Sequence, residues 1–381
     1  MKKVSHGLTC AILSISLLTV MAGAAVAPAL DTIAKHFSTQ GSMLTQLIVS
    51  MPALFIIAST LLFRPLCKVM GSRSIALVGL LLYVVAGVGA FIVNDIYVLL
   101  ILRAALGVSV GMIMPLSTGL LSYYFPPEQQ SKLMGLSAAM NQLGGVVATM
   151  LAGVLATIDW NYPFLVYAAG LIAVVLVAIF LPNDHLAMQN TGFSAKQLIK
   201  FHPSVTAMLL IMVLFFVYPT NFATTANANG VGTVATTIIM VGLDVVAFAM
   251  GLLFPKLMRM SSHAVKYIPP VFFMAGYACL CAMGGLSGMI VGSALIGVAN
   301  GIGVPYVNTI ASIKGGKDAA VTVMPMISAA LYLGQFISPL LISPLSQLLD
   351  IQNAQYAISV TIAAVYLLQA FLTRKHHALP K

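Results

Sequence analysis

The chain has 381 residues, of which 60% are hydrophobic and 7% are charged, and its formal net charge is +10. Together with a mean hydropathy of +1.03, this composition lies far outside the range of soluble globular proteins. It excludes a soluble enzyme and predicts an all-α integral membrane protein.

A membrane-spanning helix needs about 20 apolar residues, and the hydropathy of the chain predicts twelve such helices. Almost no sequence remains for a soluble domain. The predicted spans lie near residues 8–30, 43–63, 74–93, 96–121, 133–157, 162–181, 204–225, 231–254, 267–285, 288–312, 320–345 and 354–372.

The longest polar stretch, residues 182–203, lies between the sixth and seventh predicted spans. We interpret it as a cytoplasmic linker between an N-terminal six-helix half, residues 1–181, and a C-terminal six-helix half, residues 204–381. The start of the chain imitates a secretory signal peptide, but its apolar run of about 23 residues is longer than a signal core. We therefore expect the first transmembrane helix there.

Lysine and arginine collect on the cytoplasmic side of membrane proteins. One alternate set of loops and tails carries sixteen of these residues, and the opposite set carries only Lys35. This asymmetry predicts that both termini lie in the cytoplasm, in a cell inner (plasma) membrane. Lipid headgroups account for the positive charge, so no nucleic-acid partner is expected.

The four cysteines lie in or at the ends of apolar spans without metal-ligand spacing, and the seven histidines scatter through loops and tails. The only Gly-Lys pair, Gly316 and Lys317, has Ala311 where a phosphate-binding loop needs its first glycine. We expect no metal, no cofactor, no catalytic residues and no ATP-driven pumping.

The chain contains an internal repeat. The stretch "GVSVGMIMP" begins at Gly107 and "GVANGIGVP" begins at Gly297, an offset of 190. "LLFRPLCK" from Leu61 and "LLFPKLMR" from Leu252 match at an offset of 191. An even number of spans separates equivalent helices, so the two halves have the same orientation, and such halves typically rock around a substrate site near the midplane.

The sequence resembles the major facilitator superfamily, and within it the twelve-helix drug:proton antiporter-like exporters. "RAALGVSVG", with Arg103, Gly107 and Gly111, is similar to the family's fourth-helix motif, and "YYFPPEQQSKLMGL" is similar to the loop after it. "DWNYPF" resembles the segment that opens the sixth helix. The resemblance covers nearly the whole chain and implies the major facilitator fold and transport by alternating access.

Two motifs depart from the family pattern. The fifth-helix antiporter motif keeps its spacing from Gly144 but lacks its proline, whereas Gly334 and Pro339 retain both residue types in helix eleven. After the second helix, Lys68 stands at the family's aspartate position and Arg64 at its leading glycine. Small residues every four positions let helices approach closely and slide, so we expect motif and gating roles at these positions.

Two charged residues lie deep inside predicted spans. Arg103 follows Asp95 by eight residues, about 12 Å at about 1.5 Å per residue, and Asp244 is the only charged residue of 236–254. Such residues usually face a cavity and mark a pathway. Because low dielectric favours the neutral carboxyl group, we expect Asp244 to load and unload protons. Asp31 is either a solvated helix end or, as the resemblance to exporters implies, a partner of Arg103 in proton coupling.

Methionine, aromatic and amide side chains at mid-depth form the candidate substrate cavity. Methionine and aromatic groups give an adaptable apolar wall, and a few amides give polar contacts. Such a lining suits amphipathic organic molecules better than a highly charged metabolite. The candidates are Met112, Met114, Asn141, Gln142, Tyr218, Asn221, Asn300, Tyr306, Tyr332 and Gln335.

These features predict a proton-coupled secondary transporter, a monomer that exports small amphipathic organic compounds. The alternative is uptake or facilitated diffusion of a small organic acid or sugar, with Arg103 binding the anion. A membrane receptor or an intramembrane enzyme is a further hypothesis, which no signalling domain, nucleophile–base pair or metal cluster supports. The expected partners are a small-molecule substrate, protons and the lipid bilayer.

Overall fold

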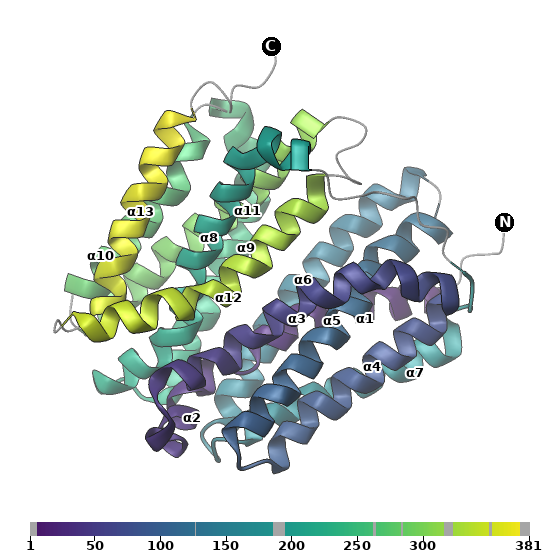
Figure 1. Cartoon of the computed structure of the whole chain (residues 1–381), viewed down its shortest axis with the longest axis horizontal. Coiled ribbons are helices and arrows are strands. Elements are labelled where there is room, and N and C mark those ends of the chain that lie inside the picture. Colours follow the sequence, from purple (N-terminus) through teal and green to yellow (C-terminus); the bar gives the residue numbers. More distant parts are fainter. Residues whose placement is uncertain are drawn as a thin grey trace. The chain divides into compact units, whose positions relative to one another are not determined.

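The computed structural model describes residues 6–125, 127–185, 195–261, 264–282, 285–315, 323–349 and 353–373. Over these ranges the protein consists of helices and connections and has no strand, which confirms the predicted fold class (Figure 1). Twelve segments of this part of the chain are long and apolar enough to cross a membrane, as predicted.

The helices divide between the two halves of the chain. The first half contains α1 (His6–Ala24), α2 (Leu30–His36), α3 (Ser42–Val69), α4 (Ser72–Gly89), α5 (Ile96–Tyr124), α6 (Pro127–Leu155) and α7 (Gly170–Phe180). The second half contains α8 (Ala195–Ala228), α9 (Thr233–Ser261), α10 (Ile268–Ala282), α11 (Leu286–Gly315), α12 (Met324–Leu348) and α13 (Ala354–Leu372). Short 3-10 helices are η1 (Ala27–Ala29), η2 (Ser38–Gln40), η3 (Ala90–Ile92), η4 (Tyr162–Ala169) and η5 (Val265–Tyr267).

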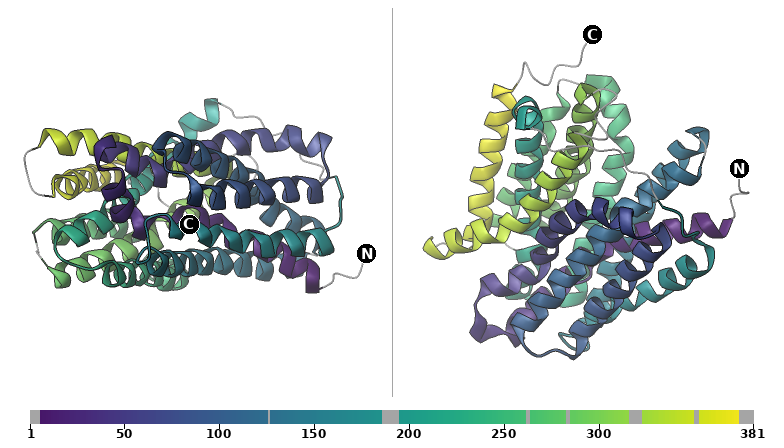
Figure 2. Two further views of the ribbon diagram at one scale, coloured as in Figure 1. Left: turned by 90° about the horizontal axis from the view of Figure 1, so that it is seen from below. Right: turned by 45° about the vertical axis from the view of Figure 1, so that its right-hand side comes forward.

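The chain forms two compact units, Met1–Gln189 and Asn190–Lys381. Their boundary falls inside the polar stretch 182–203 that we interpreted as a linker. Helix α8 begins at Ala195, so the end of that stretch is already helical and continues into the seventh span. Within the units, α4 packs beside α7 and α10 packs beside α13 (Figures 1 and 2).

The first predicted span is not one continuous helix. α1 ends at Ala24, and the chain continues through η1 into α2. Pro28 lies in the first turn of η1, and proline has no amide hydrogen to donate to a preceding carbonyl. The break leaves carbonyl groups in the last turn of α1 open to other donors.

Glycines bring helix backbones of the first unit into direct contact. A Cβ atom at Gly111 on α5 would lie 2.7 Å from the Ile56 carbonyl oxygen of α3, and one at Gly107 would meet the α3 backbone as well. A Cβ atom at Gly144 on α6 would meet the Leu17 carbonyl of α1. Small residues allow this approach in lipid, where no hydrophobic force drives helices together.

The second unit repeats these contacts at the offset of 190. Gly297 and Gly301 on α11 face the α9 backbone, and a Cβ atom at Gly297 would lie 2.7 Å from the Leu243 carbonyl oxygen. Gly334 on α12 faces α8, where the Leu209 carbonyl oxygen would lie 2.7 Å from its Cβ atom. The repeat in the sequence therefore corresponds to a repeat in the helix packing.

Helices α4 and α7 cap each other where the start of one meets the end of the other. Arg73 donates to the Ala178 carbonyl in the last turn of α7. A cation at this position also interacts favourably with the negative end of the helix dipole. The Ser72 amide of α4 donates to the Asp184 carbonyl at 2.8 Å. The Tyr124 hydroxyl donates to the Asp184 carboxylate at 2.8 Å, and burial together with this carboxylate raises the pKa of Tyr124.

The second unit has a corresponding cap. Lys266 in η5 is buried and donates to the Ala370 carbonyl in the last turn of α13 at 3.1 Å. Its ammonium group also lies 4.6 Å from the centre of the Tyr267 ring, a cation–π contact. Each half therefore places a cation from the start of its third span at the end of its sixth.

We predict that Gly107→Ala destabilises the protein, because the added methyl group must displace the α3 backbone. Overpacking of this kind costs about 1–3 kcal/mol. Gly119→Ala on the same helix is the matched control, since its Cβ atom would meet no atom within 4 Å and alanine is the better helix former by about 1 kcal/mol. The thermal unfolding midpoint in detergent should fall only for Gly107→Ala. Equal midpoints would contradict the close-packing argument.

Candidate functional site

Arg103 on α5 is held inside the first unit, with 1% of its surface exposed. Its Nε donates to the Ile48 carbonyl of α3 at 2.7 Å. One terminal nitrogen donates to the Ala22 carbonyl of α1 at 2.8 Å, and the other donates to the Tyr167 hydroxyl of η4 at 2.6 Å. The planar guanidinium group thus joins α1, α3 and η4 to α5.

Irregularities in two helices free the carbonyl groups that Arg103 uses. The Ile48 carbonyl would normally accept the amide of residue 52, but Pro52 has no amide hydrogen. The Ala22 carbonyl is one of the last four of α1, which have no intrahelical donor. The local sequence of α3 and the end of α1 therefore leave two carbonyl groups free to accept hydrogen bonds from Arg103 of α5.

Two tyrosines complete this arrangement. The Tyr167 hydroxyl donates to the same Ala22 carbonyl at 2.9 Å, and its ring centre lies 5.6 Å from the guanidinium carbon. Tyr83 packs edge-on against Tyr167 with ring centroids 5.5 Å apart, and its hydroxyl donates to a carbonyl of α1. The positive charge of Arg103 is therefore surrounded by carbonyl dipoles and aromatic groups.

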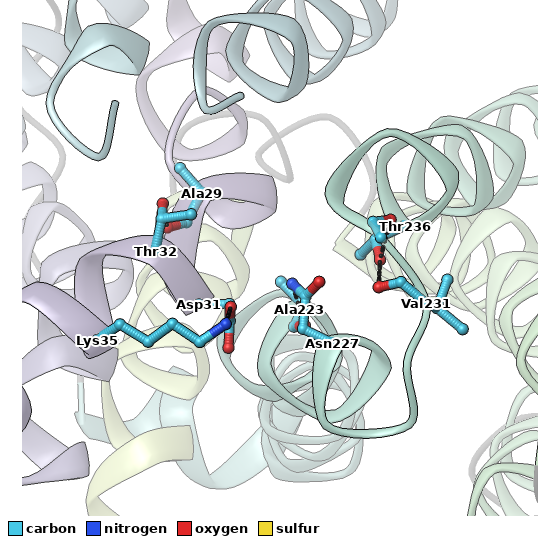
Figure 3. A network of polar contacts seen from close by, with 9 residues as sticks. Ala29, Asp31, Thr32, Lys35, Ala223, Asn227, Val231 and Thr236 are labelled. Atoms are coloured by element: carbon cyan, nitrogen blue, oxygen red, sulfur yellow. Dashed lines mark hydrogen bonds and ion pairs between the residues drawn. The ribbon is translucent and has the colours of Figure 1, made fainter. Parts of the chain in front are cut away.

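The pairing of Arg103 with Asp31 is not present. Asp31 is buried and forms an ion pair with Lys35 at 2.7 Å, one turn further along α2 (Figure 3). Residues four apart on a helix are neighbours on one face, so Lys35 reaches Asp31 directly. The guanidinium group of Arg103 is already occupied by oxygens from α1, α3 and η4, none of which belongs to a carboxylate.

In the second unit, Ser293 on α11 stands at the repeat position of Arg103. It is buried, and its hydroxyl lies 2.7 Å from the Tyr218 hydroxyl of α8. Tyr218 stacks on Phe222 with ring centroids 4.4 Å apart. Asp244 on α9 is half-buried, and its carboxylate lies within electrostatic reach of Tyr218. Two hydroxyls with a nearby carboxyl group thus stand at the position where the first unit has a fixed cation.

The polar side chains that follow Tyr218 bond mainly along α8. Asn221 donates to the Val217 carbonyl at 2.9 Å. Asn227 donates to the Ala223 carbonyl at 3.1 Å, as Figure 3 shows. Such bonds to the carbonyl four residues earlier satisfy polar side chains inside a helix. Asn221, a candidate for the cavity, is therefore anchored to its own helix by its amide nitrogen.

The cavity candidates of the first unit lie in different surroundings. Met112 on α5 is buried and Met114 is half-buried. Asn141 on α6 accepts a hydrogen bond from Thr19 of α1 at 2.8 Å, and Gln142 is exposed. Asn141 contributes to the packing of α1 on α6, which leaves Gln142 as the more accessible amide.

The remaining candidates of the second unit lie on α11 and α12. Tyr306 is buried, and Tyr332 and Gln335 are half-buried. The Gln335 amide approaches the Met212 sulfur at 3.8 Å. The Asn300 side-chain oxygen is buried and has no hydrogen-bond partner among the residues that the structure describes. An unsatisfied buried acceptor costs about 1–3 kcal/mol, so this oxygen is a candidate ligand contact.

Helix packing accounts for the position of the motif glycines. Gly107, Gly111, Gly144 and Gly334 all lie at the close helix contacts of the two units. Pro339 is buried in α12, and Lys68 is exposed at the end of α3. The side chain of Arg64 lies outside the described part of the chain.

Two residues of these sites were missed at the level of sequence. Tyr167 is 64 residues from Arg103, and no spacing signal connects them. Ser293 had a signal, because the offset of 190 places it opposite Arg103 in the repeat. A serine inside a span does not by itself indicate a functional site, whereas a charged residue inside a span does.

Residues 12–375 match the sequence profile of the Major Facilitator Superfamily. The chain belongs to this superfamily. The match confirms the resemblance drawn from the fourth-helix and sixth-helix motifs, and the family and fold are those of membrane transporters.

Curated relatives of this superfamily member match over part of its length. The riboflavin transporter RibZ of Clostridioides difficile is 27% identical over 183 residues, which cover 48% of this chain and 40% of the relative. The quinolone resistance protein NorA of Staphylococcus aureus is 26% identical over 202 residues, half of each chain. The match therefore spans about half the length of these relatives or less.

Solved structures share the fold over nearly the whole chain. A bacterial homologue of the human lysosomal transporter Spinster superposes with a TM-score of 0.81, covering 99% of this chain and 98% of that chain at 12% identity. A D-xylose–proton symporter superposes with a TM-score of 0.75, covering 97% of this chain and 98% of that chain at 14% identity. At these identities the likeness establishes the fold alone.

We predict that Arg103→Lys lowers transport at least about tenfold, because lysine keeps the charge but loses the planar fork. A lost hydrogen bond to a charged group contributes about 1.5–3 kcal/mol, and about 1.4 kcal/mol corresponds to tenfold. Tyr83→Phe is the matched control, since it removes a buried hydroxyl from the same neighbourhood that is bonded to α1 and not to Arg103. The measurement is the rate at which each variant takes up riboflavin and a fluorescent quinolone into proteoliposomes. Full transport by Arg103→Ala would refute a role for the guanidinium group.

Proposed function

We propose that this protein is a proton-coupled secondary transporter that exports small amphipathic organic compounds, acting as a monomer in the inner (plasma) membrane. The observation that carries the proposal is Asp244, a half-buried carboxyl group inside α9 within electrostatic reach of Tyr218, whose buried hydroxyl bonds to Ser293. A carboxyl group changes its charge by binding one proton, whereas a guanidinium group is protonated at all ordinary pH values.

The chemistry of the candidate cavity supports amphipathic substrates. Half-buried Met114 offers apolar surface in the first unit, and half-buried Tyr332 offers aromatic surface in the second unit, where Asn300 also offers a buried acceptor. Two relatives are named for riboflavin and for quinolone resistance. Both names denote planar aromatic heterocycles with polar substituents, and a wall of methionine and aromatic groups suits such solutes.

The state of Arg103 argues against the alternative of organic-acid uptake through this residue. Its side chain is 1% exposed, and its three nitrogens already donate to Ile48, Ala22 and Tyr167. An anion could reach the guanidinium group only if the helices that bury it separated. We therefore assign Arg103 to holding α1, α3 and η4 together and not to substrate recognition.

Proton coupling provides sufficient energy for export. A proton that moves down about 150 mV releases about 3.5 kcal/mol, enough for a few-hundredfold substrate gradient at about 1.4 kcal/mol per decade. Only a residue that changes its protonation during the cycle gives access to this energy. A structural neighbour is named as a proton symporter, so the fold is compatible with proton coupling in at least one direction.

We predict that Asp244→Asn folds normally but loses accumulation driven by a pH gradient, because it removes the titrating group while keeping its shape. Asp244→Glu should keep partial activity with a shifted pH optimum. The measurement is uptake of riboflavin and a fluorescent quinolone into proteoliposomes, with and without an imposed pH gradient. Accumulation by the Asn variant equal to that of the parent would remove Asp244 as the coupling site.

We also predict that both termini face the cytoplasm. In a background without native cysteines, an impermeant thiol reagent added outside should label Asn229→Cys, which precedes α9, and should not label Met260→Cys near its other end. Both positions are exposed in their unit, so access to the reagent depends on the side of the membrane. The reversed labelling pattern would overturn the orientation.

A further inference from the structure

Tyr218 and Ser293 form a polar contact inside the membrane-spanning part of the second unit. Their side chains are 2% and 1% exposed, and their hydroxyl oxygens lie 2.7 Å apart, with either one able to donate. Helix packing alone does not call for two hydroxyls, since two apolar groups of similar shape are often equally stable. The pair therefore needs a reason beyond packing.

The repeat shows how this pair differs from its counterpart. Ser293 occupies the position in the second half that is equivalent to Arg103 in the first. Each of the two residues bonds to a buried tyrosine from another helix of its own unit. Arg103 only donates, and the Tyr167 hydroxyl donates its hydrogen bond to the Ala22 carbonyl, so the direction of those bonds is fixed. A hydroxyl both donates and accepts, so the direction of the bond between Tyr218 and Ser293 is reversible.

The segment of α9 that carries Asp244 packs close to this pair. The carbonyl of Leu243, its neighbour in the chain, lies against Gly297, one turn along α11 from Ser293. The carboxylate of Asp244 lies within electrostatic reach of the Tyr218 hydroxyl. A reversible pair of hydroxyls thus lies near a carboxyl group that is able to change its charge.

We propose that Tyr218 and Ser293 are positioning residues that follow the protonation of Asp244 by reversing their hydrogen bond. When Asp244 is ionised, Ser293 donates to Tyr218, and Tyr218 donates to the carboxylate directly or through one water. When Asp244 is protonated, its carboxyl group donates to Tyr218, and Tyr218 donates to Ser293. No proton is lost or gained by the pair. The inference rests on the proposed function in taking Asp244 as the group that exchanges the proton.

Two other tyrosines lie within electrostatic reach of Tyr218. Tyr277 of α10 donates to the Leu214 carbonyl. Tyr356 of α13 stacks on Tyr277 with ring centroids 5.9 Å apart, and its hydroxyl is buried without a hydrogen-bond partner among the described residues. Lys266 of η5, which also packs near α9, donates to a carbonyl of α13. Among these described groups, Ser293 is the one whose hydroxyl bonds directly to that of Tyr218.

The test follows the protonated carboxyl band of Asp244 by infrared difference spectroscopy during a pH titration of the purified protein. The band is assigned by its loss in Asp244→Asn, so the readout needs no substrate. Tyr218→Phe removes the donor to the ionised carboxylate and should raise the midpoint by about 1 pH unit, the effect of one hydrogen bond to a charged group. Ser293→Ala frees Tyr218 to donate only to Asp244 and should lower the midpoint.

Two control variants match these changes in size and burial. Ser338→Ala removes a buried serine hydroxyl that donates to the Val213 carbonyl of α8, and Tyr277→Phe removes a buried tyrosine hydroxyl. Neither should shift the midpoint by more than about 0.3 pH unit, well below the effect of one hydrogen bond. A purely structural role for the pair predicts the same small shift for all four variants.

Three outcomes would overturn the inference: no shift in Tyr218→Phe and Ser293→Ala, shifts of the same sign in both, or no carboxyl band that disappears in Asp244→Asn. The proposed function is judged separately by accumulation in proteoliposomes. If Asp244→Asn abolishes accumulation while the midpoints stay unchanged, the inference about the hydroxyl pair is refuted and the proposed function stands. If the midpoints shift in opposite directions while Asp244→Asn still accumulates substrate, the coupling role of Asp244 is refuted and the inference about the hydroxyl pair stands.

Discussion

A membrane interior provides no water for a buried polar group, and the arrangement of this protein depends on that constraint. Arg103 shows it most directly. Its charge is accommodated by two carbonyl groups that are open for local reasons, because Pro52 cannot donate to Ile48 and because α1 ends soon after Ala22. Helix irregularity, which would be costly in isolation, is stabilised in this protein by a donor from another helix.

The two halves share a frame and differ in the polar group placed within it. Equivalent glycines set the distance of α5 from α3 and of α11 from α9, so the fourth span of each half sits against its second span through direct backbone contact. Into this frame the first half places Arg103, and the second half places Ser293 bonded to Tyr218. One half therefore holds a permanent charge, while the other holds groups whose hydrogen bonds are able to reverse near Asp244.

Twelve spans, the internal repeat and the family were predictable because each depends on local or periodic properties of the sequence. Apolar length determines which segments cross a membrane, and the offset of 190 aligns helices without any knowledge of their contacts. The partner of Arg103 was not predictable in this way. The acidic residue expected as its partner, Asp31, forms an ion pair with Lys35 one turn away. The actual partners are the Tyr167 hydroxyl and two backbone carbonyls, a group that every residue carries. The break after α1 was also missed, because apolar composition continues through it.

The sequence by itself determined that this chain is a helical membrane transporter of duplicated design, since hydropathy, repeat and motif are properties of residues in order. Only the tertiary structure decided which groups meet. The direction and pairing of side chains depend on helices that are distant in the chain, such as α8 with α11 and η4 with α5. A serine and a tyrosine separated by 75 residues have no meaning as a pair until packing places their hydroxyls 2.7 Å apart, because hydrogen bonding acts over ångströms and leaves no trace in the spacing of the sequence.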